Sequence, residues 1–382
     1  MDHADSDLAQ RLAGLEAGTA HLEAPLAALD LAALRLNAAD LVRRAGGRPV
    51  RVASKSVRCR RVLDEVLAMP GFAGVLAYSL REALWLADGG VADVVVGYPT
   101  VDRAALARLG PLRERVTLVV DDVAQLDLLA AGTRVCLDVD ASLRVGPLHV
   151  GVRRSPLRTP GRVGALARAA MARGLVVDGV LFYEAQIAGV PDTSMPVRWM
   201  KRRSAADLRW QRSAVVATVT AAAGPLRFVN GGGTGSLEVT AADPAVTELT
   251  AGSGLYAPAL FDRYDAFAAR PALFFALPVV RRPAADVVTV ASGGWIASGP
   301  PGWSRVPVPV TPGLRLLRTE GAGEVQTPLR GPGARRLRVG DRVWFRHAKA
   351  GELCEHVDAL HCVDESGTEA APTYRGEGFA FG

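Results

Sequence analysis

Short runs of Val and Leu alternate along the chain with longer segments whose apolar residues recur at helical spacing. Segment 31–47 is the first clear example, because its apolar positions fit a helix that ends at Gly46 and Gly47. From there the pattern repeats as strand, then helix, up to about residue 250. We predict strands at 49–54, 74–79, 92–99, 115–122, 133–140, 147–152, 178–185 and 226–232.

Strands rich in Val and Leu that alternate with helices are typical of a parallel sheet. Their number predicts an α/β fold with a TIM-type (β/α)8 barrel, and a doubly wound open sheet is the alternative. After about residue 270 the helical spacing disappears, and Pro, Gly and short Val-rich segments dominate. We therefore expect an N-terminal arm or helix (1–24), a barrel (25–270) and a C-terminal all-β domain (271–382).

The composition narrows the class of protein. Of the 382 residues 49% are hydrophobic and 22% are charged, which supports a large core and excludes a mostly disordered chain. Charged residues or Gly break every apolar run before it reaches membrane-spanning length, and the acidic start does not resemble a secretory signal. The net charge of +6 comes without a dense basic tract. We expect no membrane or nucleic-acid partner, and the four scattered cysteines favour the cytoplasm.

Lysine is scarce in this chain. Of 45 Lys and Arg residues only Lys55, Lys201 and Lys349 are lysines. Because Arg supplies a plain positive charge equally well, a retained lysine points to an amine that must lose its proton. Lys55 follows the first predicted barrel strand, at the end of the barrel where active sites lie. Such an amine can form a Schiff base with an aldehyde, although a surface lysine at a strand end is the plainer interpretation.

Two loops of small residues lie late in the predicted barrel, and the first directly follows a predicted strand. Segment 229–237 contains Gly233 and Thr234, and segment 251–258 reads Ala-Gly-Ser-Gly-Leu-Tyr-Ala-Pro. Exposed backbone N–H groups and hydroxyls in such loops can hold a phosphate, although each loop alone is also compatible with a plain turn. Together with Lys55 they indicate a phosphorylated aldehyde cofactor, pyridoxal 5'-phosphate (PLP).

The C-terminal region holds a dense group of potential metal ligands. Segment 345–364 contains His347, Lys349, Glu352, Cys354 and His356 among other polar residues. Such side chains bind zinc and other divalent ions, although the spacing does not fit the usual structural zinc patterns. Solvated side chains are the alternative.

Several stretches together resemble the fold-type III PLP enzymes, the alanine racemase-like group, in its D-threonine aldolase and D-serine dehydratase branch (amino acid deaminase/aldolase). They include RVASKSVRCR, GVLAYSLREALWLADGG, LFYEAQIAGVPD, VNGGGTGSLE and FRHAKAGELCEH, and the likeness covers roughly residues 25–365. It implies a barrel and a β-domain with the active site between them. Lys55 would hold PLP as an internal aldimine, and the cofactor-binding residues would be Tyr183, Gly233, Thr234, Gly252, Ser253, Gly254 and Tyr256.

The resemblance also implies a class of reaction, a lyase acting on β-hydroxy D-amino acids by retro-aldol cleavage or by deamination. Arg153 or its neighbour Arg154 would bind the substrate carboxylate or a cofactor oxygen, and ordinary surface arginines are the alternative. The alternatives to a lyase are an amino acid racemase or epimerase and a non-catalytic PLP-binding protein. A homodimer is expected from the resemblance.

Two departures from the branch concern the metal and the second base. Where metal-dependent members carry a His-x-Cys or His-x-Asp pair, this chain has Glu352 and Cys354. We expect these two to hold a divalent ion (Zn, Mn or Mg), with His347 or His356 as a further ligand. The tyrosine that racemases use as a second base has no equivalent, because Trp344 and Phe345 occupy that stretch.

Overall fold

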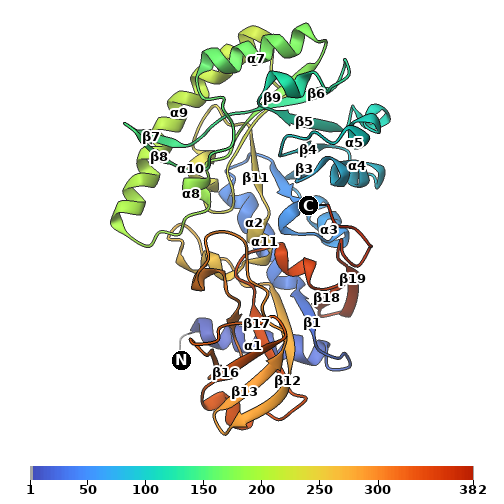
Figure 1. Ribbon diagram of the computed structural model, residues 1–382, viewed down its shortest axis with the longest axis vertical. Helices are drawn as coiled ribbons and strands as arrows, with labels where there is room; N and C mark the ends of the chain where they lie inside the picture. Colours follow the sequence, from blue (N-terminus) through green and yellow to red (C-terminus); the bar gives the residue numbers. More distant parts are fainter. Residues whose placement is uncertain (1–2, 382) are drawn as a thin grey trace.

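A closed barrel of eight parallel strands forms the larger part of the molecule, which we describe from a computed structural model covering residues 3–381. Figure 1 shows the barrel in the upper half and a second sheet below it. Neighbouring barrel strands follow the order β10-β11-β2-β3-β4-β5-β6-β9. Their bounds are β2 Val50–Ala53, β3 Phe72–Ala77, β4 Val94–Val96, β5 Val116–Val120, β6 Arg134–Asp138, β9 Val176–Phe182, β10 Phe228–Gly231 and β11 Glu248–Ala251. The predicted barrel is confirmed.

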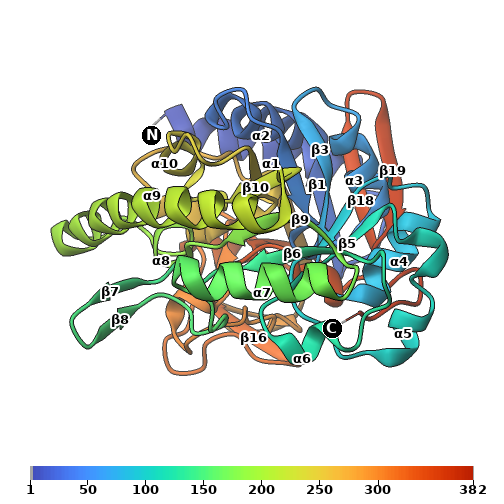
Figure 2. The ribbon, with the colours of Figure 1, turned by 90° about the horizontal axis from the view of Figure 1, so that it is seen from above.

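Helices cover the outside of the barrel, and Figure 2 shows α7 and α9 lying side by side there. Several begin where a side chain accepts a hydrogen bond from the first turn, as Asp30 does for α2 and Ser79 for α4. The α-helices of this part are α2 Leu31–Arg44, α3 Arg60–Leu67, α4 Leu80–Asp88, α5 Arg103–Ala107, α6 Val123–Leu126, α7 Pro160–Ala172, α8 Ala185–Ala188, α9 Met195–Ala223, α10 Leu237–Ala241 and α11 Ser253–Tyr256.

One predicted barrel strand was wrong, and one strand was missed. Segment 147–152 lies in a hairpin outside the barrel, formed by β7 (Leu143–Val145) and β8 (Leu148–Val150). Leu148 is 58% exposed, so its apolar side chain does not mark a buried strand. The eighth barrel strand is β11, whose four buried residues include Glu248 and Thr250 and therefore lack a continuous apolar run.

The second domain is built on a nine-stranded sheet. Its main path runs β15-β16-β13-β12-β1-β18-β19, while β17 pairs with β12 and β14. The strands are β1 Leu26–Asp30, β12 Leu273–Ala284, β13 Val287–Ala291, β14 Val308–Pro309, β15 Arg315–Leu316, β16 Gln326–Arg330, β17 Arg342–Arg346, β18 Ala359–Asp364 and β19 Gly367–Pro372.

The N-terminal part of the chain joins this second domain. Strand β1 lies between β12 and β18, antiparallel to the first and parallel to the second. Helix α1 (His3–Gly18) packs against the same sheet through Leu12 and Leu15. The domain boundary expected at residue 25 is therefore corrected, because β1 pairs with C-terminal strands and the barrel begins after it. No helix within residues 3–381 is long and apolar enough to cross a membrane.

Candidate active site

A cavity of about 700 Å³ lies at the carboxyl ends of the barrel strands. This is the end of an α/β barrel where active sites are found. The barrel side of its wall comes from loops that follow β2, β4, β5, β6, β9, β10 and β11, and the opposite side comes from the β-domain. The residues of the β-domain wall are Ser298, Gly299, Arg305, Lys349, Ala350 and Glu352.

Lys55 stands in the barrel wall of this cavity, in the single 3-10 turn (Ser54–Ser56) that follows β2. Its Nζ donates a hydrogen bond to the hydroxyl of Tyr98, at 2.8 Å. Burial alone raises the pKa of Tyr98, but Lys55 and Arg154 outweigh it and lower that pKa. The Arg154 guanidinium lies 5.6 Å from the Tyr98 ring centre and 5.3 Å from that of Tyr183. A lysine amine, two phenol rings and a guanidinium therefore meet at one place.

A buried carboxylate holds the first Gly-rich loop. Glu184 follows β9 and is fully buried. It accepts hydrogen bonds from the backbone N–H of Gly232 at 3.2 Å and from the hydroxyl of Ser236 at 3.1 Å, as well as from Thr240. The Arg212 guanidinium pairs with it at 3.0 Å. Sequence reasoning missed Glu184, whose only signal was its place beside Tyr183.

The second loop packs directly on the first. The backbone N–H of Gly254 donates to the Thr234 hydroxyl at 3.0 Å, and a Cβ on Gly254 would come within 2.7 Å of that side chain. A Cβ on Gly252 would lie 2.5 Å from the Ala53 carbonyl oxygen. Any other residue at either position would force its neighbours to shift.

The two loops leave backbone donors free at the cavity. Among the described residues, the N–H groups of Thr234, Gly252 and Ser253 have no hydrogen-bond partner, and all three residues line the cavity. A phosphate group accepts from such a cluster of N–H donors. The free donors, the glycine cradle and the Lys55 amine therefore fit PLP.

An acidic side chain that sequence reasoning missed also lines the cavity. Asp138 ends β6, and burial, reinforced by Asp121, raises its pKa to about 7. Arg154 opposes this rise. Asp138 can therefore hold or release a proton near neutral pH.

The β-domain wall carries separate charged groups. The Lys349 Nζ donates to the Ser298 hydroxyl at 2.9 Å, while the Glu352 carboxylate accepts from the Ser298 backbone N–H at 3.0 and 3.2 Å. Burial lowers the pKa of Lys349, and Lys55 and Arg305 lower it further against the opposing effect of Glu352. Arg305 packs across Gly299, and its Nε is buried without a partner in the described part of the chain. Sequence reasoning had not assigned Arg305 or Ser298 a role.

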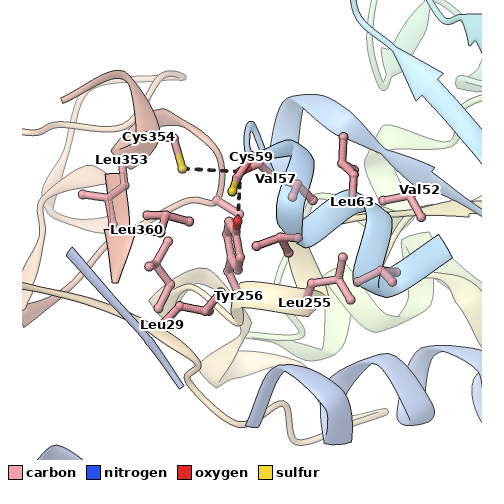
Figure 3. Close-up of a cluster of buried hydrophobic side chains, with 14 of the residues drawn as sticks. Leu29, Val52, Val57, Cys59, Leu63, Leu255, Tyr256, Leu353, Cys354 and Leu360 are labelled. Carbon is pink, nitrogen blue, oxygen red and sulfur yellow. Dashed lines mark hydrogen bonds between the residues drawn. The ribbon is translucent and has the colours of Figure 1, made fainter. Parts of the chain in front are cut away.

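Some residues named from the sequence lie elsewhere. Tyr256 is fully buried between the barrel and the β-domain, outside the cavity wall (Figure 3). Gly254 supports the loop from behind rather than lining the cavity. Arg153 and Arg154 are both exposed, but only Arg154 lines the cavity. Neighbouring side chains of a non-helical segment point in different directions, so only one of the two arginines faces inward.

The residues named for a metal do not form a ligand set. The Cys354 thiol is buried and donates to the Val57 carbonyl, away from Glu352 in the cavity wall. His347 is buried, which lowers its pKa to about 3, and the His356 ring stacks on Trp295. Within residues 3–381 no group of three or more His, Cys, Asp or Glu side chains could hold a metal ion. The geometry of these residues therefore does not fit the expected ion.

Known proteins resemble the chain in sequence and in fold. No family model matches it. It is 28% identical over 294 residues to a D-threonine aldolase of Arthrobacter sp., which covers 72% of each chain. The structure is similar to that of D-threonine aldolase from Filomicrobium marinum, with a TM-score of 0.78, 23% identity and coverage of 94% of this chain and 96% of that one.

Two further solved structures share the fold. One is D-threo-3-hydroxyaspartate dehydratase from Delftia sp. HT23, with a TM-score of 0.75, 21% identity and coverage of 92% and 97%. The other is an alanine racemase-like protein from Idiomarina loihiensis, with a TM-score of 0.69, 15% identity and coverage of 93% and 97%. These likenesses confirm the resemblance carried by the motifs: the chain has the fold-type III architecture of the alanine racemase-like group and is similar in sequence to its D-threonine aldolase branch.

Proposed function

We propose that this chain is a PLP-dependent lyase that acts on β-hydroxy D-amino acids, with Lys55 as the residue that holds the cofactor. One observation carries the proposal: the Lys55 amine and the free N–H donors of two packed glycine loops line the same cavity. Such a cavity suits a ligand with an aldehyde that reacts with the amine and a phosphate that accepts from the N–H donors, as PLP has. The similarity to a D-threonine aldolase supports the same class of reaction.

The β-domain wall distinguishes a lyase from a simple binding protein. When bound, PLP draws electrons from the bonds at the substrate α-carbon. In our proposal Lys55 Nζ accepts the α-proton in deamination, and in aldol cleavage it gives a proton to the α-carbon once the Cα–Cβ bond has broken. Glu352, which lines the cavity, accepts the proton of the β-hydroxyl in aldol cleavage. Lys349, in the same wall, gives a proton to the departing hydroxyl in deamination.

A racemase is the weaker alternative. In racemases of the group that the chain resembles, a tyrosine of the C-terminal domain is the second base at the α-carbon. Neither aromatic residue at the corresponding stretch is free for this role: Trp344 donates its indole N–H to Glu16 at 2.6 Å, and Phe345 is buried against Phe275. Both lie outside the cavity wall.

Product analysis tests the proposal. Purified protein loaded with PLP is incubated with D-threonine, D-serine and their L-isomers, beside the Lys55→Ala variant. Glycine and an aldehyde identify aldol cleavage, and ammonia with a keto acid identifies deamination. Interconversion of D- and L-isomers without either product set, or the same turnover in the variant, contradicts the proposal.

A dehydratase for a substrate with a second carboxylate is the second candidate. Arg305 and Lys349 both line the β-domain wall, and neither forms an ion pair within the described residues. Two unpaired cations favour an anionic group on the ligand. Comparing kcat/KM for D-threonine with that for D-3-hydroxyaspartate decides between the candidates, since the second candidate requires the dicarboxylate to be preferred.

Oligomeric state and location stay predictions. A homodimer is expected from the resemblance, and Ile296 and Trp303, which are 54% and 52% exposed, lie in the segment that approaches the cavity. Light scattering of the PLP-loaded protein tests this, and a monomeric mass contradicts it. A cytoplasmic location is expected from the composition alone.

A further inference from the structure

The backbone that follows Lys55 makes few hydrogen bonds of its own. Residues 54–56 form a single 3-10 turn, and the N–H groups of Val57 and Arg58 both donate to the Ser54 carbonyl. Arg58 then adopts a left-handed conformation with φ +49°. A non-glycine residue in that region persists only where surrounding structure holds it. Something outside this segment must therefore fix its position.

Two buried side chains donate to the Val57 carbonyl oxygen. The Tyr256 hydroxyl lies 2.9 Å from it and the Cys354 thiol 3.4 Å from it (Figure 3). Tyr256 comes from the end of the barrel sequence and Cys354 from the β-domain, and both are essentially inaccessible to solvent. A carbonyl oxygen has two lone pairs, so one acceptor serves both donors.

The β-domain holds the neighbouring carbonyls as well. The Tyr374 backbone N–H donates to the Arg58 carbonyl at 2.9 Å. Gly351 lies so close to Lys55 that a Cβ on it would fall 1.9 Å from the Lys55 carbonyl oxygen. Its φ of +94° also requires glycine. The β-domain thus contacts the backbone of residues 55–58 at several points.

We propose that Tyr256 and Cys354 are positioning residues, which together hold the Val57 carbonyl and so fix where the Lys55 amine stands in the cavity. This inference rests on the proposed role of Lys55. It assigns a shared task to the two residues that the sequence had linked to the cofactor and to a metal. The β-domain would then have two tasks: it forms the cavity wall opposite Lys55, and through Cys354 it helps to hold the backbone next to Lys55.

The geometry implies a specific pattern of effects. If one donor is removed, the other still satisfies the Val57 carbonyl. If both are removed, a buried acceptor loses every partner described here, and its segment must shift to find another. The double variant should therefore lose more than the product of the two single effects.

The experiment measures how fast PLP reacts with Lys55. Tyr256→Phe, Cys354→Ala and the double variant are mixed with PLP, and the growth of the visible cofactor absorbance band is followed. We expect single variants within about threefold of the unmodified protein and the double variant slower by about tenfold or more. Cys354→Ser placed in the Tyr256→Phe background should restore the rate, because a hydroxyl donates where a methyl cannot.

A matched control separates positioning from general destabilisation. Cys362 is also a buried β-domain thiol, but it lies in β18 away from Lys55, so Cys362→Ala should lower thermal stability without slowing the reaction. If the double variant slows the reaction no more than the product of the singles, or if Cys354→Ser fails to restore it, the proposal is wrong. If the double variant does not fold, Tyr256→Phe with Cys354→Ser decides, because its hydroxyl is the one remaining donor: a rate within about threefold of the unmodified protein supports the proposal, and a rate about tenfold lower overturns it.

A second readout keeps this test independent of the proposed function. Reductive methylation of Lys55 by formaldehyde and borohydride, followed by mass spectrometry, reports on the amine without PLP. If the unmodified protein forms no PLP band, the proposed function fails, while the methylation rates still test the positioning role. Equal methylation rates in the unmodified protein and the double variant overturn the positioning role even where the band forms.

Discussion

The two walls of the cavity are built differently. On the barrel side, a buried carboxylate and its partners fix the loop positions: Glu184 holds residues from Gly232 to Thr240 and is itself paired with Arg212. On the β-domain side, Lys349 and Glu352 both form hydrogen bonds with Ser298. The Nε of Arg305 is buried and has no partner within residues 3–381. The barrel-side loops are held in place by buried partners and present free backbone N–H donors, whereas the β-domain wall offers side chains that few contacts hold.

This difference suggests a division of labour. Preorganised groups suit a cofactor that stays in place, because their hydrogen bonds are set before it binds. Side chains that few contacts hold suit a substrate that binds and leaves in each turnover. We therefore expect changes in the barrel wall to affect PLP binding, and changes in the β-domain wall to affect turnover and substrate choice.

The largest expected effect is the loss of Lys55. Lys55→Ala removes the amine that attaches the cofactor, and we expect kcat to fall by roughly a thousandfold or more. Lys201→Ala serves as the control, because that lysine pairs with Asp192 outside the cavity. Steady-state kinetics with excess PLP checks this. If the kcat of Lys55→Ala stays within tenfold of that of the unmodified protein, Lys55 is not the residue that attaches PLP.

The next effect concerns the support of the phosphate loop. Glu184→Gln removes a buried charge that accepts several hydrogen bonds, and we expect PLP to bind about tenfold to a hundredfold more weakly. The exposed Glu365 provides a matched control. Equilibrium titration with PLP measures the dissociation constant. An unchanged constant, with only kcat reduced, would show that the barrel wall does not have the role assigned to it.

A smaller effect is expected on the opposite wall. Lys349→Met leaves the glycine loops untouched, so the dissociation constant for PLP should stay within about twofold while kcat/KM falls about tenfold. The fall should be larger for a dicarboxylic substrate than for D-threonine if the second candidate function holds. Weaker PLP binding with unchanged kcat/KM would reverse the proposed division of labour.

The smallest effect is on stability and involves Glu82, a fully buried residue of α4 that accepts a hydrogen bond from the Tyr374 hydroxyl at 3.0 Å. Burial raises the pKa of Glu82 from 4.5 to about 7. Between these values the folded protein retains a proton that the unfolded chain has released, so the free energy of unfolding falls as pH rises through this window.

Below pH 4.5 Glu82 is protonated in both the folded and the unfolded chain, so this loss of stability is absent. Glu82→Gln cannot ionise, so its free energy of unfolding should depend less on pH across the window. Urea unfolding at several pH values checks this, with Glu365→Gln expected to retain the unmodified slope. Identical slopes for Glu82→Gln and the unmodified protein would contradict the assignment.

The barrel and the cofactor end of the cavity could be predicted because their signals are local. Val and Leu runs mark most barrel strands, and Lys55 and the first glycine loop directly follow predicted strands. The residues that hold these loops in place could not be predicted from the sequence. Glu184 and Ser236 are 52 positions apart, and neither a glutamate nor a serine in the sequence indicates a buried contact.

Two errors share a physical cause. Cys354 and Tyr256 were linked to chemistry because their side chains can coordinate or donate, yet both are buried at the contact between the domains. Residues 26–30 fell within the expected barrel range, yet they form β1, whose partners in β12 and β18 lie more than two hundred residues along the chain. Residue type and sequence order do not determine which distant segment a group packs against.

The central claim is that one lysine, Lys55, attaches PLP. The most direct test is to add PLP to the purified protein, reduce it with borohydride and locate the added mass by peptide mass spectrometry. The chain has three lysines, two of which line the cavity, so the position of the added mass shows which lysine binds PLP. We predict a visible band lost on reduction and the added mass on Lys55 alone. No band, or the added mass on Lys349, would contradict the account.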